Sequence, residues 1–212
     1  MKSRRCFLSG LLFAMALRPA GAAASEMEAG TKAFFAGKID EALQHWDKQI
    51  AADPAAGPHH WQRGLALYYA GKYQEGRLQF ESHQLVNPQD VENAAWHFLC
   101  VAKLENPEAA RKVFIPITRD PRVPMKEIHA LYAGKGTAEA VLEAAEKEKQ
   151  EDGAALKNHR CYAHLYLGLY YEALGDAARA KTHLTKAAGE FRQDHYMGKT
   201  AQVHCQLRGW KV

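Results

Sequence analysis

The chain has 212 residues, with 28 lysines and arginines against 24 aspartates and glutamates. The excess of positive charge lies at the start, because residues 1–24 contain Lys2, Arg4, Arg5 and Arg18 and no acidic residue. Removing these four leaves 24 basic residues, equal to the 24 acidic ones. A neutral remainder lacks the basic patch typical of a nucleic-acid-binding protein, so we expect no nucleic-acid partner.

The first 24 residues have the layout of a signal peptide. A basic start precedes an apolar stretch from Phe7 to Leu17, and small residues from Ala20 to Ala24 allow cleavage after Ala22 or Ala24. The apolar stretch is shorter than the roughly 20 residues that cross a bilayer, so we expect no stable membrane anchor after cleavage. The sequence predicts an exported protein, most consistent with a bacterial periplasm.

The export route is suggested by the paired arginines. Ser3-Arg4-Arg5-Cys6-Phe7-Leu8 resembles a twin-arginine signal, which carries proteins that are already folded. The alternative is an ordinary secretory signal that contains two arginines. Cleavage leaves the widely spaced Cys100, Cys161 and Cys205, which form no disulfide framework and which we expect to be buried thiols.

A repeat with a period of 34 residues follows the leader. It pairs Gly30 with Gly64, Gly37 with Gly71, Trp46 with Phe80, and Pro54 with Pro88. A further unit near the C-terminus has small residues at Gly168 and Ala180, where two helices are expected to touch, and large ones at Tyr171 and Leu184 beside them. Gly175 is placed to make the turn between these helices.

This period and these residues resemble the tetratricopeptide repeat (TPR) family, and the last unit is similar to those of small exported NlpI-like TPR proteins of bacteria. The resemblance implies an all-α solenoid of helical hairpins, a single domain over residues 25–212. Its units are expected at about 25–56, 57–90, 91–122, 123–156 and 159–192, with a capping helix at 197–208. The third unit is degenerate and the fourth is divergent. The signature residues are Gly30, Gly64, Gly168, Tyr171, Ala42, Ala180, Pro54 and Pro88.

The first helix of each TPR unit lines the concave face, so the resemblance implies a groove that binds a protein or peptide. The lining positions carried over to this chain are Phe34, Trp61, Leu65, Tyr68, Leu99, Tyr162, Leu165 and Leu169. Exposed aromatic residues are common at binding hot spots, which favours Trp61 and Tyr68. The alternative is that several of these residues, the leucines above all, belong to the core between repeats.

Two other functions remain open alternatives. The chain has 11 histidines, which suggests a periplasmic metal-binding protein. His59 and His60 point apart on a helix, however, and His97 with Cys100 supplies only two ligands of the four or so that zinc needs. A weaker alternative is a hydrolase that uses His97 and Cys100. No catalytic motif is visible, so we expect no enzyme activity, no cofactor and no metal ligands.

Overall fold

The computed structural model describes residues 20–147 and 153–212, and within these ranges the chain is all-α, without a strand. This confirms the predicted fold class at the level of its secondary structure. The predicted leader, with Arg4 and Arg5, lies outside the described residues apart from its last few positions.

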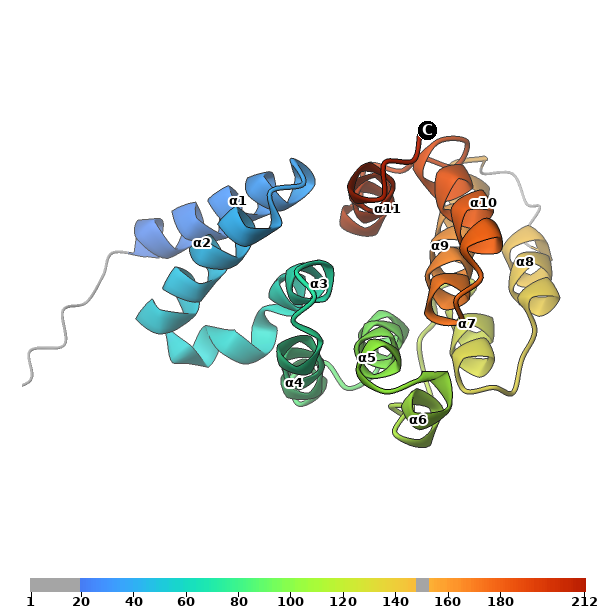
Figure 1. The fold of residues 1–212 in the computed structure, drawn as a ribbon, viewed down its shortest axis with the longest axis horizontal. Helices are drawn as coiled ribbons and strands as arrows, with labels where there is room; N and C mark the ends of the chain where they lie inside the picture. The colour runs from blue at the N-terminus through green and yellow to red at the C-terminus, as the bar shows by residue number, and fades with distance from the viewer. Residues whose placement is uncertain (1–19, 148–152) are drawn as a thin grey trace, which may run out of the picture.

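Eleven α-helices and one 3-10 helix make up this part of the chain (Figure 1). They are α1 (Ala20–Phe35), α2 (Ile39–Ala52), η1 (Pro54–His59), α3 (Trp61–Tyr69), α4 (Tyr73–Gln84), α5 (Val91–Leu104), α6 (Pro107–Lys112), α7 (Met125–Tyr132), α8 (Ala138–Lys147), α9 (Gly153–Ala173), α10 (Ala177–Ala188) and α11 (Tyr196–Leu207). Consecutive helices pack in pairs, α1 on α2, α3 on α4 and α9 on α10.

Four pairs of helices are joined by the same turn. Between α1 and α2, Gly37 has a φ of 74°, Lys38 N–H donates to the Ala33 carbonyl at 3.0 Å, and Gly37 N–H donates to the Phe34 carbonyl at 2.9 Å. This is a helix end closed by a left-handed glycine. The same conformation recurs at Gly71, Gly134 and Gly175. The divergent pair α7 and α8 therefore shares its turn with the pairs that carry the signature residues.

Close contact at a glycine holds three of these pairs together. A Cβ atom at Gly30 would lie 2.4 Å from the Trp46 ring. The equivalent atom at Gly64 would lie 2.6 Å from the Phe80 ring. At Gly168 it would lie 2.4 Å from Leu184 Cγ. Only glycine lets the two backbones approach this closely, which is the packing that the sequence pattern predicts.

The third pair differs, because α6 has only six residues. No regular secondary structure follows it up to the start of α7, and this connection is tied back to the start of α5. Gln89 Oε1 accepts hydrogen bonds from the N–H groups of Thr118 and Arg119 at 3.0 and 2.9 Å, and Asp120 accepts one from Val91 N–H at 3.2 Å.

The final helix, α11, lies between the α1–α2 pair and the α9–α10 pair (Figure 1). It packs on α10 and α9, as a helix that caps the last pair would, and it also contacts α1. In addition, α3 packs on α5, and α5 packs on α9. Together these contacts place five helices around a common interior: α1, α3, α5, α9 and α11. Nowhere in the described ranges is a helix both long and apolar enough to cross a membrane.

Candidate functional site

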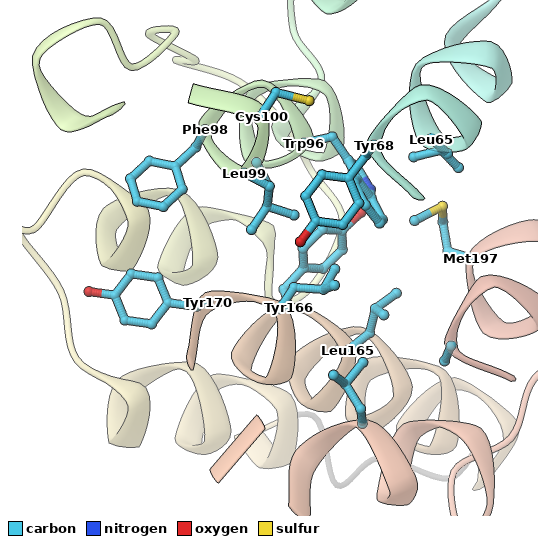
Figure 2. Close-up of a cluster of buried hydrophobic side chains, with 14 of the residues drawn as sticks. Leu65, Tyr68, Trp96, Phe98, Leu99, Cys100, Leu165, Tyr166, Tyr170 and Met197 are labelled. Carbon is cyan, nitrogen blue, oxygen red and sulfur yellow. The ribbon is translucent and has the colours of Figure 1, made fainter. Parts of the chain in front are cut away.

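Most of the residues expected to line a binding groove are buried. Phe34, Leu65, Tyr68, Leu99, Leu165 and Leu169 have at most 2% of their surface exposed. Figure 2 shows Leu65, Tyr68, Leu99 and Leu165 in one hydrophobic cluster with residues of α5 and α9. The expectation that Tyr68 is exposed is therefore wrong, and the alternative that the leucines belong to the core describes them correctly. Trp61 and Tyr162 alone of the eight are partly exposed.

The helix α11 lies in the interior, where the sequence predicts an open groove. Tyr196, at the start of α11, packs on Trp61 and on Phe34, with ring centroids 4.6 and 5.8 Å apart. Further along, His204 is fully buried, with its Nδ1 atom 3.2 Å from the Tyr69 hydroxyl. The C-terminal helix thus fills space that an open solenoid leaves to a partner.

A cavity of about 210 Å³ remains beside α11. We call it the inner cavity. It lies between α3, α4, α5 and the start of α11, and the connection before α7 contributes one residue. Its lining residues are Trp61, Leu65, Phe80, His83, Asp90, Glu92, Asn93, Trp96, Arg122 and Met197. Of the expected groove residues, Trp61 and Leu65 lie here.

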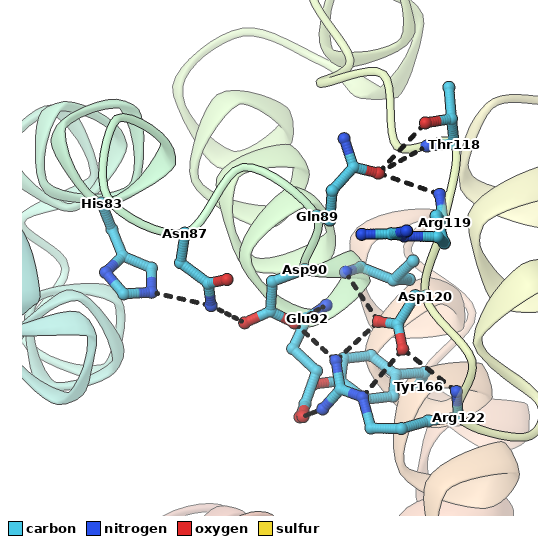
Figure 3. Close-up of polar contacts among 11 residues, drawn as sticks. His83, Asn87, Gln89, Asp90, Glu92, Thr118, Arg119, Asp120, Arg122 and Tyr166 are labelled. Atoms are coloured by element: carbon cyan, nitrogen blue, oxygen red, sulfur yellow. Dashed lines mark hydrogen bonds and ion pairs between the residues drawn. The ribbon is translucent and has the colours of Figure 1, made fainter.

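Charged residues cluster on one side of the inner cavity around Arg122 (Figure 3). The Arg122 guanidinium contacts Asp90 and Asp120 at 2.6 Å each, and it also contacts Glu92. Asp90 caps α5, because its side chain accepts a hydrogen bond from Glu92 N–H at 3.0 Å. Tyr166 of α9 donates its hydroxyl to Glu92 at 2.6 Å. Three carboxylates therefore surround one guanidinium.

The surroundings shift the pKa values of these groups in different directions. Burial raises the pKa of Glu92 to about 7, and Asp90 adds to the rise, although Arg122 and Tyr166 oppose it. Burial acts in the same direction on Asp120, but hydrogen bonds from Arg122 and Val91 N–H lower its pKa overall. The pKa of Arg122 is raised despite burial, because the three carboxylates stabilise its charge. Near neutral pH, Glu92 can thus gain or lose a proton.

Two buried polar atoms beside the charged cluster lack a hydrogen-bond partner among the described residues. They are Nε1 of Trp96, a residue 1% exposed, and Oδ1 of Asn93, a residue 3% exposed. Both residues line the inner cavity, together with Leu65 and Met197. Buried polar groups are normally hydrogen-bonded, so an unpartnered donor and acceptor mark this cavity as a place for a polar ligand.

The residues of the two alternative functions lie elsewhere. Cys100 is fully buried, and burial raises the pKa of its thiol well above the usual range. His97, the other residue of the suggested hydrolase pair, has its Nε2 atom 3.2 Å from Glu81 Oε1. Cys161 and Cys205 are also free and buried. Over residues 20–147 and 153–212, no group of three or more histidine, cysteine or acidic side chains is arranged to hold a metal ion.

Sequence reasoning missed most of the inner cavity: Asp90, Glu92, Asn93, Trp96, Arg122 and Met197. One signal was available, since Arg122 lies in a connection with three prolines, and binding residues are often found on loops. Tyr162, an expected groove residue, lies next to this region, because its ring stacks on Tyr166 at 6.5 Å. No protein-family model matches the chain.

Proposed function

We propose that this chain is an exported TPR-type scaffold that binds a protein or peptide partner at its inner cavity. The observation that carries the proposal is the inner cavity itself. It combines two tryptophans, a charged cluster and two unpartnered polar atoms on the interior side of a helical-hairpin array.

The TPR assignment is supported by the turns at Gly37, Gly71 and Gly175 and by the three glycine contacts, which fall at positions of the repeat pattern. Export is supported by the basic, apolar and small segments of the first 24 residues. A scaffold fits these features better than an enzyme does, because Cys100, the one nucleophile that the sequence suggested, is buried with a raised pKa.

The experiment compares proteins captured from native cell extracts by the unmodified chain, by Trp61→Ala and by Leu85→Ala. Trp61 lines the inner cavity, whereas Leu85 is 82% exposed outside it and serves as the matched control. We expect a partner that the unmodified chain and Leu85→Ala both capture and that Trp61→Ala loses. Identical partner sets for all three proteins would contradict the proposal.

A further inference from the structure

We propose that the inner cavity binds a primary ammonium or guanidinium group, such as the side chain of a lysine or arginine residue in the partner. This inference rests on the proposed use of the cavity as the binding site. It adds the chemical class of the group that the cavity recognises.

The charge balance of the cavity favours a cation. Arg122 is the one lysine or arginine among its described lining residues, and its guanidinium is already bound by Asp90, Glu92 and Asp120. The cluster carries three negative charges against one positive charge when Glu92 is ionised, and two against one when Glu92 is protonated. The Asp90 and Glu92 side chains keep 20% and 14% of their surface exposed, so a second cation can reach them.

The uncharged lining is complementary to the same kind of group. Tryptophan is the aromatic residue that attracts cations most strongly, and both Trp61 and Trp96 line the cavity. Asn93 Oδ1 offers an unpartnered acceptor to an N–H donor of the ligand. Trp96 Nε1 offers a donor, which suits the carbonyl oxygen of a peptide that carries the basic side chain.

The size of the cavity limits the ligand to one group. Its volume of about 210 Å³ is smaller than the roughly 300–1,000 Å³ of pockets that enclose drug-sized ligands. Leu65, Phe80 and Met197 supply apolar surface against which the alkyl stem of a basic side chain can pack. A single side chain therefore matches the space better than a folded surface does.

Isothermal titration calorimetry on the full chain tests the inference with two pairs of probes. The first pair is n-butylammonium and the neutral n-butanol. The second is a short capped alanine peptide with lysine at its centre and the same peptide with norleucine there. We expect the charged member of each pair to bind at least about tenfold more tightly than the neutral one, a difference of about 1.4 kcal/mol.

Two variants locate the binding. Glu92→Gln removes a charge and keeps the shape, while Asp90→Asn removes a charge and keeps a residue that caps helices well. Each should weaken the binding of the lysine peptide about tenfold, whereas Glu75→Gln, at an exposed position outside the cavity, should not. Thermal unfolding of each variant shows whether it is folded, and one folded variant of the two is enough to locate the binding.

The outcomes separate this inference from the proposed function. Equal binding of the lysine and norleucine peptides would overturn the cation preference and leave peptide binding in place. If n-butylammonium binds and neither peptide binds, the result would support the cation site, with free amines as its ligands, and would contradict the peptide scaffold. Binding of none of the four probes would overturn the inference.

Discussion

Acid should destabilise this protein through Glu172, a residue of α9 that holds α11 in the interior. One of its carboxylate oxygens lies 2.9 Å from His204 Nε2, and the other accepts hydrogen bonds from Arg208 at 2.5 and 3.0 Å. Although burial opposes the change, His204 and Arg208 lower the pKa of Glu172 from 4.5 to about 2. The folded chain therefore binds the proton of Glu172 more weakly than the unfolded chain does.

The size of the effect follows from this difference in pKa. The stabilisation is fully present above pH 4.5 and is lost as the pH falls through about 2. Its full value is about 3 kcal/mol, since one pKa unit corresponds to about 1.4 kcal/mol. At pH 3 the folded chain has lost about 2 kcal/mol of it.

Urea unfolding at pH 7 and pH 3, followed by circular dichroism, measures this contribution. His204 also titrates in this range, so both chains carry His204→Gln. In that background the loss of unfolding free energy between the two pH values should be larger with Glu172 than in Glu172→Gln, because Arg208 still lowers the pKa of Glu172. In the same background the control Glu75→Gln, at an exposed position, should lose as much as the chain with Glu75. Equal losses with and without Glu172→Gln in the His204→Gln background would refute the reasoning.

Three further predictions concern packing. Gly168→Ala should destabilise the chain by about 2 kcal/mol, because the added Cβ would lie 2.4 Å from Leu184 Cγ. The control Gly153→Ala, in the same helix, should have little effect, because nothing lies within 4 Å of the added Cβ. Thermal unfolding compares the two variants, and equal stabilities would contradict the packing. Tyr196→Ala should cost about 2 kcal/mol or more in urea unfolding, since this ring joins α11 to α1 and α3, and an unchanged midpoint would argue against that role. The three buried cysteines should resist a thiol reagent in the folded chain and react in urea, and rapid labelling of Cys100 without urea would show that it is accessible.

The contacts within each hairpin could be predicted from the sequence because they are local. The position of Gly168 relative to Leu184 depends only on helix geometry and one short turn, and a glycine in that turn has an obvious steric reason. The same reasoning failed for the burial of Tyr68. Whether an interior residue is exposed depends on how strongly the whole array curves, which no single repeat determines.

The inner cavity could not be predicted because its residues meet only through long-range packing. Arg122 reaches Glu92 across a connection without regular structure, so no periodic pattern relates the two residues. Met197 is brought to the cavity by α11, whose place against α1 requires the chain to curve back on its own beginning. Repeat spacing contains no information about that closure.

The most direct test of the central claim, that the inner cavity binds the ligand, uses the indole N–H signals of the four tryptophans in a ¹H–¹⁵N NMR spectrum. Titration with the lysine peptide should shift the signals of Trp96 and Trp61, which line the cavity. The signal of Trp46, a residue of α2 that is fully buried against α1, should not move. A peptide that binds while the Trp96 signal stays unchanged would contradict the account.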